Sequence, residues 1–167
     1  MNILSTERLH LREVTAADAE FILELLNAPK FKAFIGDRGV RTIEDAAKYI
    51  EGRFTKSYIE NGFGLWLMGR AADAVAVGIC GFVSRNELPD PDIGFALLPQ
   101  FERQGYAFEA ADAVMRYGRE SLSLSRVLAI TTLDNESSGR LLTKIGFVFE
   151  SEIEMGGETL KLFAADK

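Results

Sequence analysis

The stretch that decides the fold is PQFERQGYAFEAADAVMRYG, Pro99 to Gly118. It follows a short apolar segment, residues 92–98, whose composition predicts a strand buried on both faces. From Gly105 onward, small and apolar residues recur at helical spacing, so we expect a helix with one slim side to begin there. A strand, a glycine turn and a helix in succession leave unpaired backbone N–H groups at the helix start, which attracts phosphate.

The turn therefore predicts a phosphate site built from backbone amides. Gly105 permits a close approach of the backbone to a ligand. The amides that can surround a pyrophosphate belong to five successive residues: Arg103, Gln104, Gly105, Tyr106 and Ala107. The sequence contains neither the Gly-x-x-x-x-Gly-Lys-Ser/Thr loop of nucleoside triphosphatases nor the Gly-x-Gly-x-x-Gly turn of a dinucleotide fold. An ordinary strand-to-helix connection with a glycine in it is the alternative.

Length and composition predict a single globular domain over residues 1–167, with 26% charged and 47% hydrophobic residues. The net charge of −6 argues against nucleic acid as a partner. No apolar run has membrane-spanning length and no signal pattern precedes the domain, so we expect a cytoplasmic protein without a membrane partner. The lone cysteine, Cys80, and the lone histidine, His10, argue against a disulfide framework and against a metal site.

The rest of the chain alternates between helical and strand patterns. Leu9 and Leu11 indicate an early strand, and the start signals at residues 15–18 and 42–45 each precede a helical pattern. The further predicted elements are strands at 63–68, 74–83, 92–98 and 126–133, a helix at 135–144, and a hairpin of 147–153 with 159–163. This order predicts an α/β (α+β) domain with a mixed, mostly antiparallel sheet.

A second polar constellation follows the predicted strand at residues 126–133. Asn135 is a good helix N-cap and Gly146 a good helix end, which is a purely local interpretation. Asn135 and Ser138 are three residues apart on a helix, so both can face one cleft. There the amide can hydrogen-bond a ligand amide, and the hydroxyl can donate a proton.

Together these segments resemble a known family. The turn ERQGYA, residues 102–107, and the later Asn135, Ser138 and Gly146-Phe147 are similar to the GNAT acyltransferase superfamily. TERLxLR at residues 6–12 and DIGFxLLP at residues 92–99 resemble more narrowly its ribosomal-protein N-acetyltransferase-like branch. The resemblance covers nearly the whole chain in the expected order.

The resemblance implies acetyl-CoA as cosubstrate, bound where two central parallel strands, 92–98 and 126–133, splay apart in a sheet flanked by helices. The pyrophosphate would lie on the amides of 103–108, and the pantetheine along 95–98. The residues that it assigns to the cofactor are Phe95, Leu97, Leu98, Arg103, Gln104, Gly105, Tyr106, Ala107, Phe108, Asn135 and Ser138. Arg140 or Lys144 would contact the adenosine phosphate, unless they are simply solvated.

Two positions depart from the family pattern. Glu102 stands where the turn often begins with Gln or Arg, and an acid near phosphates is unfavourable unless it points away. Leu142 stands where many members carry a tyrosine that protonates the departing thiolate. Ser138 is then the expected general acid, with a water molecule as the alternative.

The implied chemistry is direct attack of a neutral amine on the thioester in a ternary complex, which needs a base and an oxyanion donor. Asp92, which begins the strand along the cofactor, is the expected base. Alternatives are Glu60, Glu87 and Asp90. A backbone N–H near Leu97 or Leu98 would polarise the carbonyl. Cys80 as an acyl carrier is a further alternative, although on an apolar strand it is expected in the core.

The acceptor is expected over residues 31–54, with Phe31 and Phe34 in contact with it. The leading hypothesis is an N-acetyltransferase that acts on a primary amine, either a protein N-terminus or a small molecule. The alternatives are transfer of a different acyl group, a CoA-binding sensor or interaction module without catalysis, and, more distantly, a phosphate-loop hydrolase. The sequence is compatible with a monomer or a homodimer.

Overall fold

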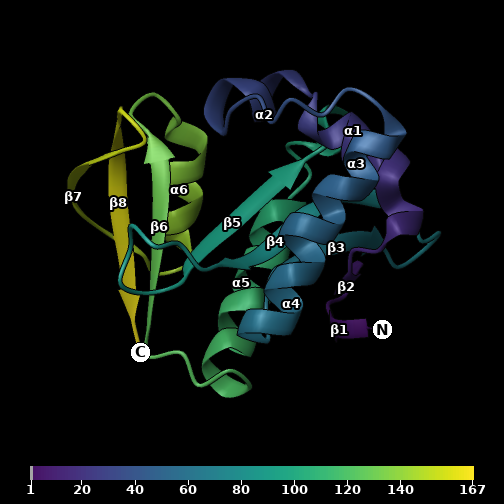
Figure 1. Ribbon diagram of the computed structural model, residues 1–167. Coiled ribbons are helices and arrows are strands. Elements are labelled where there is room, and N and C mark those ends of the chain that lie inside the picture. The colour runs from purple at the N-terminus through teal and green to yellow at the C-terminus, as the bar shows by residue number, and fades with distance from the viewer. Residues whose placement is uncertain (1) are drawn as a thin grey trace.

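The computed structural model describes residues 2–167 and arranges them around one twisted sheet (Figure 1). The strands are β1 Asn2–Ser5, β2 Leu9–Glu13, β3 Leu65–Arg70, β4 Ala76–Val83, β5 Asp92–Leu97, β6 Arg126–Thr132, β7 Val148–Met155 and β8 Glu158–Asp166. The helices are α1 Ala19–Leu26, α2 Pro29–Phe34, α3 Ile43–Tyr49, α4 Lys56–Asn61, α5 Tyr106–Glu120 and α6 Glu136–Lys144. None of these helices is both long and apolar enough to cross a bilayer.

The sheet has the strand order β1-β2-β3-β4-β5-β6-β8-β7, and every neighbouring pair is antiparallel except β5 and β6. The parallel pair is joined only where Asp92 lies opposite Leu128. Beyond that point β5 and β6 diverge, as Figure 1 shows. The predicted mixed, mostly antiparallel sheet with two splayed central strands is confirmed.

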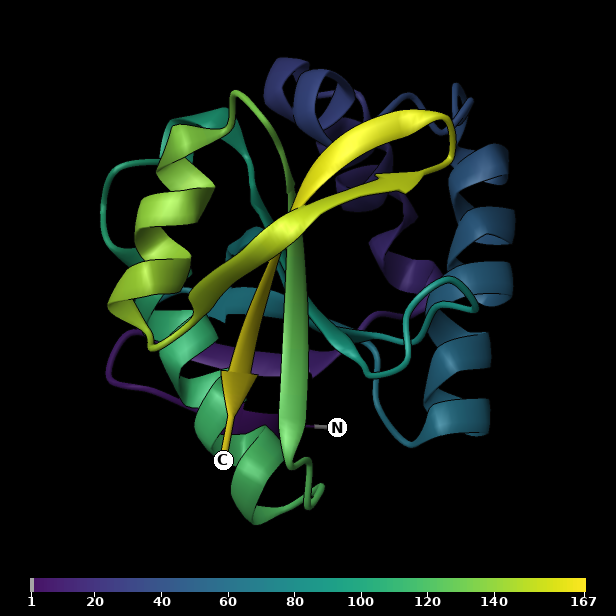
Figure 2. The same ribbon diagram turned by 90° about the vertical axis from the view of Figure 1, so that its left-hand side faces the viewer.

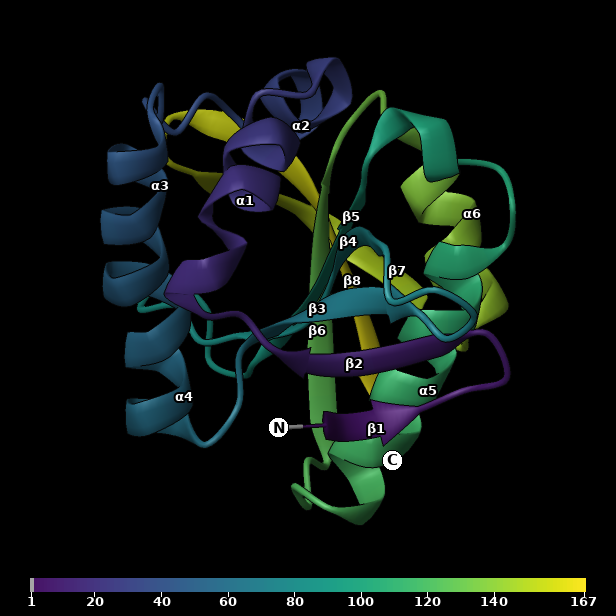
Figure 3. The same cartoon turned by 90° about the vertical axis from the view of Figure 1, so that its right-hand side faces the viewer.

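One face of the sheet is covered by α5, as predicted for a helix with a slim side (Figure 3). Ala110, Ala111 and Val114 are fully buried there against aromatic side chains of β3 and β4. A Cβ at Gly118 would lie 2.6 Å from the ring of Phe82, so only glycine allows this approach of helix to sheet.

The opposite face is covered by α1 to α4, whose apolar residues pack on Leu67 and Ile79 of the sheet. The predicted start at residues 42–45 is confirmed, because Thr42 and Asp45 cap each other's backbone N–H groups. The helix then runs without a break from Ile43 to Asn61, where Gly62 ends it at φ +74°. Within it, Ile50–Thr55 forms a π-helical segment that the sequence pattern did not predict.

The structure departs from the sequence-based expectation in two further places. The edge strand β1 was not predicted, because its four residues are too few to show an alternation. The strand at 92–98 was expected to be buried on both faces, yet Gly94–Leu97 is only half-buried. The reason is the divergence from β6, which removes the neighbour that would cover this edge.

Candidate active site

A cavity of about 1060 Å³ opens between the diverging ends of β5 and β6. The residues that line it lie on both sides of the sheet. On the α5 and α6 side they include Gly105, Phe108, Asn135 and Ser138, and on the α1 to α4 side Phe31, Phe34, Tyr49 and Arg53. Because a single residue pair joins the two strands, the cavity passes through the sheet, and two ligands can enter it from opposite faces.

The predicted phosphate turn lies at one end of this cavity. Gly105 is the N-cap residue of α5 at φ +83°, and Arg103 adopts the left-handed region at φ +60°. Within residues 2–167, no side chain caps the first turn of α5, so its amides are free for a ligand. Of the residues assigned to this site, Arg103, Gly105, Ala107 and Phe108 line the cavity.

The side chains of Gln104 and Tyr106 point elsewhere. Gln104 Nε2 donates to the carbonyl of Gln100 at 3.0 Å, and Tyr106 is buried in the α5 core. These two residues can contribute only backbone atoms to a ligand, which a pattern of residue types does not distinguish.

The N-terminal segment holds the turn in place through Arg8 and Glu109. Arg8 Nε donates to Glu109 Oε1 at 2.7 Å, and the Arg8 backbone N–H donates to Glu109 Oε2 at 2.9 Å. Arg8 Nη1 also donates to the carbonyl of Gln104 at 2.9 Å, and its guanidinium lies 4.5 Å from the centre of the Tyr106 ring. The segment TERLxLR thus supports the turn instead of lining the cavity.

The acid that departs from the family pattern is neutralised by a lysine on α2. Lys30 Nζ lies 2.8 Å from Glu102 Oε2. Both residues also line the cavity. The ion pair offsets part of the repulsion that Glu102 would exert on a phosphate, and it links α2 to the turn.

The exposed edge of β5 presents alternate backbone groups to the cavity. The N–H of Leu98 donates to the carbonyl of Val77 at 2.9 Å, toward β4. Because backbone groups alternate along a strand, the N–H groups of Phe95 and Leu97 face the opposite, open edge. Leu97 rather than Leu98 can therefore supply an oxyanion donor. The Leu98 side chain is buried against α1 to α4, away from the cavity.

The start of α6 keeps its local role and also faces the cavity. Asn135 Oδ1 accepts from the N–H of Ser138 at 3.3 Å, so the predicted N-cap is confirmed. Both side chains line the cavity, as does Arg140. Lys144 Nζ lies 4.4 Å from the centre of the Phe108 ring, beside the turn.

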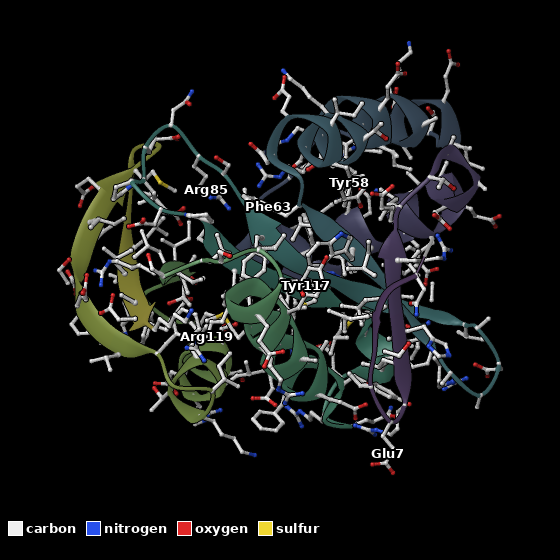
Figure 4. All side chains as sticks on the ribbon, turned by 90° about the horizontal axis from the view of Figure 1, so that it is seen from below. Glu7, Tyr58, Phe63, Arg85, Tyr117 and Arg119 are labelled. Carbon is white, nitrogen blue, oxygen red and sulfur yellow. The ribbon has the colours of Figure 1, made fainter. Side chains whose placement is uncertain are left out.

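Asp92 lies where the two strands meet, at the closed end of the cleft. It is 1% exposed, lines the cavity, and its Oδ1 accepts from Arg85 Nε at 2.9 Å. Burial raises the pKa of Asp92, and the neighbouring Arg85 only partly offsets this effect. Figure 4 shows Arg85 on the loop before β5, between the β7–β8 hairpin and the α3–α4 helix.

The alternative bases and the thiol are placed differently. Glu60 and Glu87 line the cavity, whereas Asp90 lies 3.7 Å from the guanidinium of Arg126. Cys80 is fully buried in the α5 core, and burial raises the pKa of its thiol. A buried neutral thiol is a poor nucleophile, so the position of Cys80 does not support an acyl-carrier role.

The wall on the α1 to α4 side is aromatic and built around the π-helical segment. The rings of Tyr49 and Phe54 meet edge to face at 5.9 Å, and the Arg53 guanidinium lies 5.6 Å from the centre of the Tyr49 ring. A Cβ at Gly52 would meet no atom within 4 Å. The tip of the β7–β8 hairpin bends toward this wall (Figure 2), and Met155, Gly156 and Glu158 complete the lining.

Sequence reasoning missed several residues of this site. No sequence motif pointed to Arg85, Gly52 or Lys30, because their roles depend on the folded arrangement of the chain. Thr131 and Thr132 did carry a signal, since two hydroxyl groups end an otherwise apolar strand. Both line the cavity.

Comparison with known proteins identifies the fold and the family. Residues 8–148 match the acetyltransferase (GNAT) domain family. The uncharacterized N-acetyltransferase YoaA of Bacillus subtilis is 34% identical over 146 residues, which cover 87% of this chain and 82% of that protein. A GNAT-family acetyltransferase structure from Bacillus anthracis has a TM-score of 0.80 at 25% identity, covering 99% of this chain and 98% of that one.

A ribosomal alpha-N-protein acetyltransferase solved in complex with coenzyme A has the same fold, with a TM-score of 0.78 at 17% identity. The aligned region covers 99% of this chain and 98% of that chain. The matched family spans the turn, both diverging strands and α6, which are the elements that build the cavity. The chain therefore belongs to the GNAT family, and it is an acetyltransferase.

Proposed function

We propose that this acetyltransferase transfers the acetyl group of acetyl-CoA to a primary amine by direct attack in a ternary complex. The observation that carries the proposal is a single cavity lined from both faces of the sheet at the point where β5 and β6 diverge. Such a cavity lets a thioester and an amine approach each other from opposite faces without a covalent enzyme intermediate.

The proposed binding of the cofactor depends on backbone hydrogen-bond donors. The free amides at the start of α5 bind the pyrophosphate, and the open edge of β5 pairs with the pantetheine. Asn135 and Ser138 contact the pantetheine from α6. The Leu97 N–H polarises the thioester carbonyl and stabilises the oxyanion that forms as the amine attacks.

The proton transfers rest on Asp92 and Ser138. Asp92, whose pKa is raised by burial, is suited to accept the proton of the substrate ammonium, which leaves the neutral amine that attacks the thioester. Since Asp92 lies five residues along β5 from Leu97, about 16 Å for an extended strand, the proton reaches it through water molecules. Ser138 supplies a proton to the departing thiolate, since Leu142 at the family's tyrosine position has none to give. A water molecule in place of Ser138 is the alternative, and a Ser138→Ala variant with unchanged turnover would favour it.

The proposed binding of the acceptor amine depends on the aromatic wall. Phe31 and Phe34 contact the acceptor together with Tyr49, whose ring faces the same cavity. The resemblance of TERLxLR and DIGFxLLP to the ribosomal-protein N-acetyltransferase-like branch favours a protein N-terminus as the acceptor. A small-molecule amine is the second candidate, because the same wall also suits a compact ligand.

The test is release of free CoA thiol from acetyl-CoA against a panel of N-terminal peptides, polyamines and other small amines, with calorimetric titration of CoA alongside. Turnover with any amine supports the proposal and begins to define the acceptor. CoA binding without turnover across the panel favours a CoA-binding sensor instead. If CoA did not bind at all, the proposed cofactor would be wrong, and so would both the acetyl-CoA-dependent transfer and the CoA-binding sensor.

A further inference from the structure

Two threonines that line the cavity each have a buried hydroxyl group without a hydrogen-bond partner. Within residues 2–167, neither Thr131 Oγ1 nor Thr132 Oγ1 has a hydrogen-bond partner. The two residues are only 7% and 8% exposed. A buried polar group without a partner destabilises a folded protein, and such groups are rare in folded structures. A pair of them at the end of one strand indicates that something other than the protein satisfies them.

The two hydroxyls face opposite sides of the sheet, because successive side chains alternate along a strand. Thr131 shares its face with Val127 and Ala129, which pack in the α5 core. That face also carries Leu142 of α6, so it is the side of the phosphate turn and of Asn135. Thr132 therefore faces the α1 to α4 side.

The pairing of β6 with β8 locates Thr132 further. Thr132 lies opposite Leu160, and paired residues of antiparallel strands point to the same face. Leu160 lines the cavity together with Glu158 from the hairpin tip. Thr132 thus belongs to the half of the cavity that contains the aromatic wall.

We propose that the Thr131 hydroxyl hydrogen-bonds the pantetheine arm of coenzyme A and that the Thr132 hydroxyl hydrogen-bonds the amine acceptor. This inference rests on the proposed function, and it assigns one residue of β6 to each substrate. The pantetheine amides offer both a donor and an acceptor, and a hydroxyl can pair with either. On the other face, Thr132 binds a polar group of the acceptor.

Thr132 would bind the acceptor and take no part in the proton transfer at Asp92. It lies four residues along β6 from Leu128, the residue opposite Asp92, a distance of about 13 Å for an extended strand. Its loss should therefore raise KM for the acceptor while kcat changes little. Thr131 should act on CoA affinity alone.

The test uses Thr131→Val and Thr132→Val, which remove the hydroxyl and keep a β-branched side chain suited to a strand. Without ligand, each variant should melt about 2–4 °C higher than wild type, because an unpaired buried hydroxyl is gone. Thr131→Val should raise the Kd for CoA about fivefold to tenfold. Thr132→Val should leave that Kd unchanged and raise the acceptor KM by a similar factor.

Serine variants at both positions keep the hydroxyl and should retain the wild-type Kd and KM. Thr143→Val is the matched control, since that exposed hydroxyl already donates to the carbonyl of Gly139 at 3.0 Å. A lower melting temperature in the valine variants would mean that the hydroxyls were already satisfied. Wild-type protein that binds CoA while Thr131→Val binds it equally would overturn the cofactor assignment alone. Wild-type protein that fails to bind CoA would instead overturn the proposed function.

Discussion

The phosphate turn and the aromatic wall lie at opposite ends of one cavity and are built in different ways. The turn presents backbone amides, and Arg8 and Glu109 hold it from outside through several hydrogen bonds. The wall presents side chains from Ile50–Thr55, and its Gly52 faces open space. The turn thus offers preformed backbone donors, whereas the wall is a surface whose shape depends on a few side chains.

Under the proposed function, this difference separates the two substrates physically. A backbone site depends on φ and ψ angles, so changes at the turn should act on CoA binding. A side-chain site depends on bulk and polarity, so changes at the wall should act on the acceptor. The four predictions below test that separation, in order of the expected effect.

The largest effect is expected at Asp92, where the two halves meet. Asp92→Asn should lower kcat about 100-fold to 10,000-fold, the range for loss of a general base, with the Kd for CoA unchanged. Because burial raises the pKa of Asp92, the wild-type rate should fall with decreasing pH already above the usual carboxyl range. That acidic limb should be absent from the pH profile of the variant.

Glu87→Gln is the control for this prediction, since Glu87 also lines the cavity. We expect it to keep its activity and its acidic limb. If Glu87→Gln lost the activity and Asp92→Asn kept it, the base would be Glu87.

The second effect concerns the turn. Gly105→Val places a branched side chain at φ +83°, with its Cβ 3.2 Å from Arg8 Nη2, and should raise the Kd for CoA about 10-fold to 100-fold. Gly39→Val carries similar strain at φ +74° in a place where a Cβ meets no atom within 4 Å. Both variants should lose stability, but only the first should lose CoA affinity in a calorimetric titration. Equal CoA binding by the two would refute the turn as the pyrophosphate site.

The third effect concerns the wall. Gly52→Leu fills the open space beside Arg53 and should raise the acceptor KM about tenfold, the scale of one apolar side chain in the wrong place. The free energy of unfolding should not fall, because glycine is unfavourable within a helix. Gly52→Ala should have a much smaller effect on KM. A weakened CoA affinity in Gly52→Leu would contradict the separation of the two sites.

The smallest effect concerns the ion pair that links α2 to the turn. Lys30→Met leaves Glu102 without its partner beside the turn, and should raise the Kd for CoA about twofold to fivefold at low salt. The difference should shrink as salt screens the charge. Adding Glu102→Gln to Lys30→Met should restore the affinity. If the double variant remained impaired, Lys30 would itself contact the cofactor.

Local patterns were sufficient where the relevant interactions are local. The glycine turn before α5, the caps at Thr42 and Asn135, and the slim face of α5 were all predicted from residues a few positions apart. The mostly antiparallel sheet followed from the order of these elements and from the resemblance. The π-helical segment was not predicted, because residues 42–61 have an ordinary helical composition that does not distinguish a π-helical turn from an α-helical one.

The amino-acid sequence by itself determined that a glycine turn precedes a small-residue helix and that an N-capped helix follows a buried strand. The tertiary structure decided which side chains support that turn and which remain free. Arg8 and Glu109 are 101 residues apart in the chain, and only the folded sheet brings them together. Within residues 2–167, it also leaves the hydroxyl groups of Thr131 and Thr132 without hydrogen-bond partners. Backbone preferences act over a few residues, whereas the pairing and the isolation of polar groups depend on the whole fold.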